Sequence, residues 1–316
     1  MQISTGSQAQ MLTKIIRTDF NRISDFIAKP LMGRTGVIKN ISTSFPPKEC
    51  NSICFCVHAE QNLDAPPKEC LVITLPSLCD KLLQLGYSVL TSDFPKYHMA
   101  LIANRLLLQP EEPRIHPSAI IGQDVRLGSN VSVGAHSYLD GEIDIGDDCN
   151  IGSNVCIRNN VKLGHKSTIL NGTVIGENPY TYGFGPNHLS ERFPATGGVE
   201  IKDNVEIGNN VVISRGVSND TVIESHCRVN DLTHIGNSVV VGTRSLIMAN
   251  CDISARVIIG EECWVGQSSV LIQAVRIGNK AQLGAGSIVT RNIPSGVVAF
   301  GTPAKPKSKR KFTSFT

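Results

Sequence analysis

The sequence has few aromatic residues and no strong excess of either charge. Of its 316 residues, 5% are aromatic and one is tryptophan, while 30 Lys and Arg against 27 Asp and Glu leave a net charge of +3. This charge is too small to argue for nucleic-acid binding. No apolar run is long enough to cross a membrane, and the N-terminus has no signal-peptide hydrophobic segment, so we expect a cytoplasmic protein with no membrane span.

The ten cysteines include no Cys-x-x-Cys pair and no spacing typical of a metal site. Four of them, Cys149, Cys227, Cys251 and Cys263, fall on an inward position of the repeat described next. We therefore predict packing residues of a reduced protein, and we expect no metal.

An aliphatic residue recurs at every sixth position over much of the chain. The longest unbroken series is Ile223, Val229, Ile235, Val241, Ile247, Ile253, Ile259, Val265, Leu271, Ile277, Leu283 and Val289. The residue two positions earlier is usually small or β-branched, and the residue after the aliphatic is often glycine. A period of six fits no α-helix. Two inward positions in six describe a short strand of a parallel β-helix, and three such strands per coil give roughly eight to nine coils.

The repeat divides the chain into a domain and a β-helix. We expect a small α/β domain over residues 1–110, suited to binding a nucleotide sugar, a β-helix over 114–293 with a loop insertion at 177–198, and a basic tail at 294–316. Within the first domain, the patterns predict helices at 18–31, 76–85 and 98–108 and strands at 37–41, 53–57, 70–74 and 87–91.

The insertion at 177–198 concentrates aromatic residues, among them Tyr180, Tyr182 and Phe184. Long loops in compact repeat proteins are usually functional or disordered, and aromatic residues argue against disorder. The insertion therefore predicts a contact with substrate or with another subunit, and a merely packed loop is the alternative.

Several motifs resemble the UDP-3-O-acylglucosamine N-acyltransferase family of lipid A synthesis. They are the strand Ile53-Cys54-Phe55-Cys56, the run Phe94-Pro95-Lys96-Tyr97, Ile115-His116-Pro117, the segment Gly172–Gly176, Gly183-Phe184-Gly185 and Ile213-Ser214-Arg215-Gly216. The resemblance implies a left-handed parallel β-helix, a homotrimer with active sites between subunits, and transfer of an acyl group from a thioester to the amine of a nucleotide-linked sugar. It also implies that Phe55 lies beside the nucleotide base.

Two histidines of that family are absent. The run Ile235-Gly236-Asn237-Ser238 stands where the family has Ile-Ala-His-Asn, so its general base is missing, and Ala274 takes the place of a second His. We also expect that residues 294–316 do not form the helical C-terminal extension of that family.

The C-terminal run Gly301-Thr302-Pro303-Ala304-Lys305 instead resembles hexapeptide acetyltransferases that use acetyl-CoA. This resemblance implies acetyl-CoA or another acyl-CoA as donor, with acyl carrier protein as the alternative. Lys305 is then expected near CoA, and backbone groups of Gly266, Gly284 and Ala285 are expected to line the pantetheine slot.

His234 is the best remaining candidate for a base, since amide formation requires that the attacking amine lose a proton. Asp252 follows it by eighteen residues, one coil, so the two should lie roughly 4.8 Å apart across the strands. A carboxylate there can fix the imidazole tautomer; the alternative is a solvated surface pair. Asn237 is expected to bind the sugar or polarise the thioester carbonyl, unless it is an ordinary turn residue with left-handed backbone angles.

The sequence as a whole therefore predicts an N-acyltransferase that moves a short acyl group from CoA to a nucleotide-linked amino sugar. Two alternatives stay open, namely UDP-3-O-acylglucosamine N-acylation from acyl carrier protein and a catalytically degenerate scaffold or sugar-binding protein. A zinc hydratase on the same fold needs three convergent histidines, and the sequence has no His-x4-His pair to supply them.

Overall fold

The computed structural model describes residues 17–42, 45, 47, 49–58, 69–107 and 112–309. The chain forms two compact units, residues 1–112 with 314–316 and residues 113–313, and each is described by itself. Of the helices in these described ranges, none is long and apolar enough to cross a membrane.

The first unit is a small α/β domain around a four-stranded parallel sheet. The sheet order is β3 (Asn40–Ile41), β4 (Ser52–Cys56), β5 (Leu71–Thr74) and β6 (Ser88–Thr91). The helices are α1 (Phe20–Phe26), α2 (Cys79–Gln84) after a 3-10 turn at Pro76–Leu78, and α3 (Pro95–Ile102) followed by a π-helical turn at Ala103–Leu107. A separate antiparallel pair joins β1 (Thr18–Asp19) to β2 (Val37–Ile38).

Most predicted elements of this unit are present with shifted ends, whereas the predicted strand 37–41 is divided between β2 and β3, which belong to different sheets. Helix α1 starts later than expected because Asp19 caps it, accepting a hydrogen bond from the Arg22 N–H at 2.8 Å, and it stops early because Ala28 adopts φ 50. Helix α3 starts three residues before the predicted His98, because Pro95 is well tolerated in a first helical turn.

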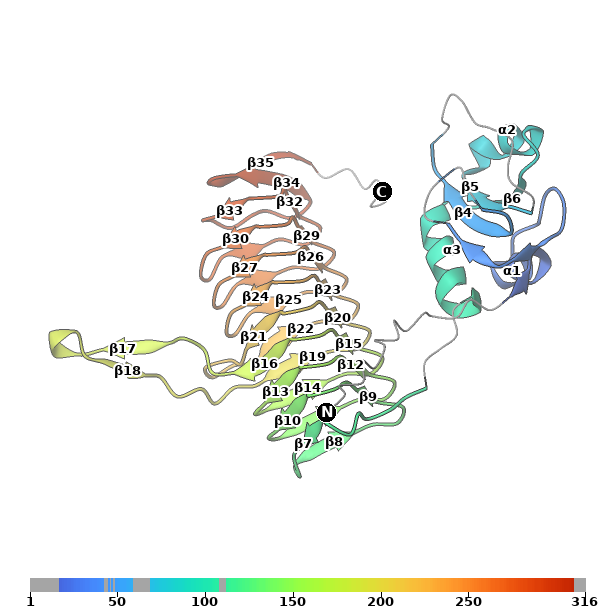
Figure 1. Ribbon diagram of the computed structural model, residues 1–316. Coiled ribbons are helices and arrows are strands. Elements are labelled where there is room, and N and C mark those ends of the chain that lie inside the picture. The colour runs from blue at the N-terminus through green and yellow to red at the C-terminus, as the bar shows by residue number, and fades with distance from the viewer. Residues whose placement is uncertain are drawn as a thin grey trace, which may run out of the picture. The chain divides into compact units, whose positions relative to one another are not determined.

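The second unit is a parallel β-helix whose coils each contribute one strand to three sheets, as Figure 1 shows. The nine-stranded sheet runs β33 (Ile288–Val289), β30 (Val270–Leu271), β27 (Asp252–Ile253), β24 (His234–Ile235), β21 (Val212–Ser214), β16 (Val174–Glu177), β13 (Cys156–Arg158), β10 (Tyr138–Asp140) and β7 (Ile120–Ile121). The eight-stranded sheet runs β31 (Arg276–Ile277), β28 (Ile258–Ile259), β25 (Val240–Val241), β22 (Thr221–Ile223), β19 (Val199–Ile201), β14 (Val161–Leu163), β11 (Ile143–Ile145) and β8 (Val125–Leu127). The ten-stranded sheet runs β35 (Ala304–Lys309), β34 (Val297–Gly301), β32 (Gln282–Leu283), β29 (Trp264–Val265), β26 (Leu246–Ile247), β23 (Arg228–Val229), β20 (Glu206–Ile207), β15 (Thr168–Ile169), β12 (Asn150–Ile151) and β9 (Ser132–Val133).

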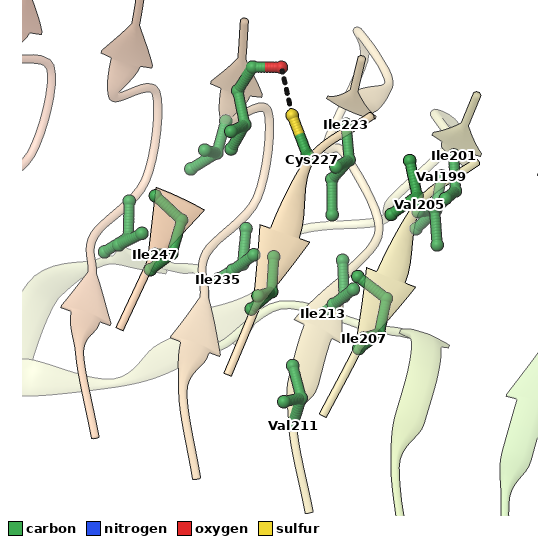
Figure 2. Packing of buried hydrophobic residues seen from close by; sticks show 14 of the residues in the cluster. Val199, Ile201, Val205, Ile207, Val211, Ile213, Ile223, Cys227, Ile235 and Ile247 are labelled. Atoms are coloured by element: carbon green, nitrogen blue, oxygen red, sulfur yellow. Dashed lines mark hydrogen bonds between the residues drawn. The ribbon is translucent and has the colours of Figure 1, made fainter. Parts of the chain in front are cut away.

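The aliphatic residues of the repeat fill the narrow core between these sheets, which confirms the predicted β-helix. Ile223, Ile235 and Ile253 are fully buried, and Figure 2 shows such side chains from neighbouring strands pointing toward one another. Removal of these apolar side chains from water stabilises the stack of coils. A single coil would bury too little apolar surface to be stable by itself.

The small inward residues link the coils through hydrogen bonds. The hydroxyl of Ser245 donates to the Gly260 carbonyl at 2.7 Å, and the thiol of Cys227 donates in the same way to the Gly242 carbonyl at 3.1 Å. All four cysteines predicted to face inward are buried in the core and form no disulfide within the described residues, so their packing role is confirmed. Burial raises the pKa of the Cys227 thiol to about 11.

The corners of the coils repeat one backbone conformation. Ser238, Arg256 and Ala274, on three successive coils, have φ values of 57, 61 and 64, in the left-handed region. Glycine follows the inward aliphatic residue because the next coil is very close: a Cβ on Gly242 would lie 2.5 Å from the carbonyl carbon of Gly260.

The insertion forms an antiparallel hairpin of β17 (Tyr182–Phe184) and β18 (Ser190–Arg192), with a 3-10 turn at Pro186–His188 between them. The hairpin extends away from the β-helix (Figure 1). Strands β16 and β21 still pair across it, with Ile175 opposite Ile213 and a register shift between Ile175 and Glu177. At the C-terminal end of the unit, β35 folds back antiparallel on β34, so Lys305, Lys307 and Lys309 of the basic tail lie on a sheet-edge strand.

Candidate active site

His234 and Asp252 face each other on neighbouring strands, as their eighteen-residue separation predicts. The His234 Nδ1 and Asp252 Oδ1 atoms are 2.9 Å apart, and the side chains are 49% and 56% exposed. An ionised carboxylate can only accept a hydrogen bond, so it selects the tautomer with the proton on Nδ1. The Nε2 atom then keeps its lone pair and is available to accept a proton.

This pair interrupts an otherwise largely apolar column of outward residues. The residues that pair in register along this column of the nine-stranded sheet are, in order, Ile120, Tyr138, Cys156, Val174, Val212, His234, Asp252, Val270 and Ile288. In this column only His234 and Asp252 carry ionisable groups other than a thiol or a phenol, whereas Asp140, Arg158 and Glu177 lie at the ends of β10, β13 and β16. A histidine and a carboxylate within an apolar column are a chemical feature that packing of the β-helix does not require.

A groove of about 870 Å³ lies next to this pair, at the corner where the nine-stranded sheet gives way to the eight-stranded sheet. Three predicted substrate-binding residues, Tyr180, Tyr182 and Phe184, line it together with Asn237. The Tyr180 and Tyr182 rings contact edge to face with centroids 4.9 Å apart, and the Arg192 guanidinium lies 4.9 Å from the centre of the Tyr182 ring. The groove therefore has one aromatic wall from the hairpin and one wall from the β-helix.

Asn237 lies in the turn after β24, and the left-handed residue of that turn is its neighbour Ser238. The alternative of Asn237 as a turn residue is therefore confirmed in its position, but the left-handed backbone angles are wrong for Asn237. The Asn237 carbonyl accepts the Arg256 N–H at 2.9 Å, whereas its side-chain amide has no hydrogen-bond partner within the described ranges. That amide can bind a ligand in the groove. Ala274, at the position of the second missing family histidine, lines the same groove.

The histidine pair and the groove are adjacent but separate. His234 and Asp252 do not line the groove; they lie on the outer face of the nine-stranded sheet. Asn237 is three positions after His234, a distance of at most about 10 Å along an extended chain. One ligand that fills the groove and crosses the corner can therefore reach both.

The expected donor residues lie elsewhere on the unit. Gly266 and Gly284 follow strands of the ten-stranded sheet, and their N–H groups already donate to Leu283 at 3.0 Å and Ala299 at 2.9 Å. Ala285 comes next in the chain, and Lys305 lies on β35 opposite Phe300. Their role in binding CoA stays a prediction. Arg310 and Lys311 of the basic tail lie outside the described residues.

Phe55 belongs to the first unit, where it is half-buried on β4 against the core of that unit. Its place beside a nucleotide base stays a prediction. No group of three or more His, Cys, Asp or Glu side chains suited to a metal ion occurs among the residues that the structure describes.

Two residues of the groove were missed by the sequence reasoning. Arg256 and Arg276 both line it, on successive coils. Arg256 could have been found, because it lies one coil, or eighteen residues, after Ser238. The same spacing relates Asp252 to His234. Arg276 is the ladder partner of Ile258, and it too follows from that spacing.

The chain contains three segments, residues 142–177, 195–215 and 256–291, that match the model of the hexapeptide repeat of succinyl-transferase. The UDP-3-O-acylglucosamine N-acyltransferase of Methylobacterium nodulans is 34% identical over 145 residues, 46% of this chain and 41% of that protein. The enzyme of the same name from Delftia acidovorans is 31% identical over 197 residues, 62% of this chain and 58% of that protein. These relatives confirm the resemblance seen in the motifs, although the chain spans only about half the length of the curated relatives it matches.

The fold is similar to that of solved acyltransferases. The UDP-N-acetylglucosamine acyltransferase from Campylobacter jejuni aligns with a TM-score of 0.54 at 22% identity, covering 62% of this chain and 75% of that one. The Francisella novicida enzyme of the same name aligns with a TM-score of 0.56 at 18% identity, covering 62% of this chain and 71% of that one. The predicted fold class, a left-handed parallel β-helix preceded by a small α/β domain, is thereby confirmed.

Proposed function

We propose that this protein is an N-acyltransferase that moves an acyl group from a thioester to the amine of a nucleotide-linked amino sugar. The observation that carries the proposal is the His234–Asp252 pair, hydrogen-bonded at 2.9 Å between Val212 and Val270 and close to an aromatic groove. The partial relatives, which are named UDP-3-O-acylglucosamine N-acyltransferase, support the same chemistry.

In the proposed reaction, the sugar amine attacks the thioester carbonyl carbon. His234 Nε2 accepts the proton that the nitrogen loses as the new C–N bond forms, and Asp252 stabilises the resulting imidazolium. The C–S bond then breaks, and the imidazolium returns the proton to the leaving thiolate. The Asn237 amide donates a hydrogen bond to the carbonyl oxygen, on which negative charge develops.

The same proposal includes a homotrimer whose active sites lie between subunits. Val212 and Val270 flank the His234–Asp252 pair on the outer face, and Val212 is 39% exposed. A second copy packed along this face would cover the apolar column and exclude water from the pair, which strengthens the hydrogen bond between imidazole and carboxylate.

For the donor we propose acetyl-CoA or another short acyl-CoA. Lys305, Lys307 and Lys309 lie along β35, and the Lys307 ammonium is 5.5 Å from the centre of the Phe300 ring. Cations held on a strand can meet the phosphates of CoA. Acyl carrier protein, which is acidic as a class, would meet the same cations and is the alternative donor.

The test is a mass-spectrometric screen in which acetyl-CoA or a 3-hydroxyacyl carrier protein is offered with UDP-, dTDP- and GDP-linked amino sugars. We expect an acetyl mass shift on one sugar, and a long-acyl shift only from the carrier protein would instead establish the alternative donor. His234→Ala should lower kcat about 10²- to 10⁴-fold, the range for loss of a general base. Asp252→Asn should also lower it, because an amide can present its N–H and so favour the wrong tautomer.

His226→Ala is the matched control, since His226 is an exposed histidine at a corner of the same unit that lines neither the groove nor the pair. Its turnover should equal that of the unaltered protein. Full activity in His234→Ala would refute the assigned base.

A non-catalytic sugar-binding protein is the second candidate, and one observation favours it. Asn237 and Ala274 stand in one groove at the positions of both missing family histidines. Binding of a nucleotide sugar without transfer from either donor would support this candidate over the enzyme.

A further inference from the structure

Arg256 and Arg276 are the cationic side chains of the groove, and both are exposed. Among the residues that the structure describes, neither guanidinium has an ion-pair or hydrogen-bond partner. A guanidinium presents five N–H donors in a planar fork, which matches phosphate and carboxylate oxygens. Two such groups beside one cavity, with no protein partner, are suited to an anion that enters from outside.

Arginines elsewhere on the β-helix are commonly paired within the stack. Arg126 binds Asp144 through two nitrogens, one of them at 2.9 Å, and Arg244 binds Glu262 at 2.8 Å, each across one coil. The residues one coil from Arg256 are Ser238 and Ala274, neither of which is acidic. The pairing used on other faces of the β-helix is thus absent where the groove opens.

The spacing of the two guanidinium groups allows them to act together. Arg276 pairs in the ladder with Ile258, which follows Arg256 by two residues, so the two Cα atoms are roughly 8 Å apart. Arginine side chains of this separation can converge on one phosphate or bind the two phosphates of a diphosphate.

The other groove residues suit a nucleotide rather than a simple ion. Tyr180, Tyr182 and Phe184 offer aromatic surfaces, and Val240 and Ile258 form an apolar floor on the eight-stranded sheet. The one carboxylate of the lining, Asp220, already accepts the Gly198 N–H at 2.6 Å. With two guanidinium groups and one carboxylate that already accepts a hydrogen bond, the lining of the groove has a net positive charge.

We propose that Arg256 and Arg276 form an anion site that binds the phosphate groups of a nucleotide ligand in the groove. This inference deepens the proposed function and rests on it for the identity of the ligand. The phosphate belongs either to the nucleotide-linked sugar or to CoA, since both carry a diphosphate. These two residues then fix the position of one substrate relative to Asn237.

The test measures binding directly, without turnover. Isothermal titration with UDP and, separately, with CoA is applied to the full-length protein and to Arg256→Gln, Arg276→Gln and Arg244→Gln. Arg244 is the matched control because its guanidinium is paired with Glu262 outside the groove. We expect each groove variant to weaken binding of at least one ligand by about tenfold or more, the loss typical of a charge-assisted hydrogen bond, and the control to leave it unchanged.

Dependence of UDP binding on the two arginines would assign the site to the acceptor, and dependence of CoA binding would assign it to the donor. Equal affinities in all four proteins, or no binding of either ligand, would overturn the proposal. Arginine-dependent binding in a protein that transfers no acyl group would leave this site standing and refute the acyltransferase, so the two failures are distinguishable.

Discussion

Alkaline pH should destabilise this protein through Cys227, and the size of the effect follows from its burial. The folded state raises the pKa of this thiol from 9.0 to about 11, chiefly because burial disfavours the thiolate. The unfolded chain therefore loses this proton at lower pH than the folded chain does. The protonated Cys227 thiol therefore contributes its full stabilisation below about pH 9, and this contribution is lost as pH rises toward about 11. The loss in unfolding free energy is roughly 3 kcal/mol, because each pKa unit corresponds to about 1.4 kcal/mol.

The measurement compares the unfolding free energy of the protein with that of Cys227→Ser, by urea denaturation over a pH series from about 8 to about 11. Serine is a suitable substitute because Ser137 and Ser245 occupy equivalent positions and make the same hydrogen bond to a glycine carbonyl, each at 2.7 Å. Serine does not titrate in this range, and all other groups titrate in both proteins. The difference between the two curves should shrink as pH rises. A difference that is independent of pH would refute the assignment of a buried, protonated thiol.

Two further substitutions test the stack. Ile247→Ala should cost about 2 to 5 kcal/mol in unfolding free energy by urea denaturation, since Ile247 is 1% exposed, whereas Leu232→Ala at a 61% exposed corner should change it by less than about 0.5 kcal/mol. Gly242→Ala should lower the thermal midpoint because its Cβ would meet Gly260 backbone at 2.5 Å; Gly183→Ala, with nothing within 4 Å of its Cβ, is the control, and equal midpoints would contradict the close coil spacing.

The β-helix could be predicted almost residue by residue because its core is one-dimensional. Each inward position depends only on the period of six and on the residue one coil away, so counting by eighteen places Asp252 beside His234 before any coordinates exist. The same counting does not give backbone angles, so a left-handed Asn237 stood as one alternative from the sequence, whereas the left-handed residue is Ser238. That choice depends on how each corner closes, which is a local steric matter.

The groove could not be predicted, because it depends on where an insertion returns to the stack. Tyr180 and Asn237 are distant in the sequence, and no period relates a hairpin to a corner two coils later. The two arginines lie on predictable positions, but their lack of partners is visible only once their neighbours are in place. In the first unit, the ends of α1 and α3 shifted because capping by Asp19 and the tolerance for Pro95 outweighed the apolar spacing.

The pairing of the core strands on either side of the hairpin shows that the hairpin and the β-helix core are separate features. Ile175 still pairs with Ile213, and the register shifts only between Ile175 and Glu177, where the chain leaves the stack, so the buried column continues past the insertion. Sequence change in that segment is therefore free of the constraints that fix every sixth residue. Replacement of the hairpin during evolution could therefore change which ligand binds while the β-helix keeps its stability. Sequence divergence among proteins of this architecture should be concentrated at such corners.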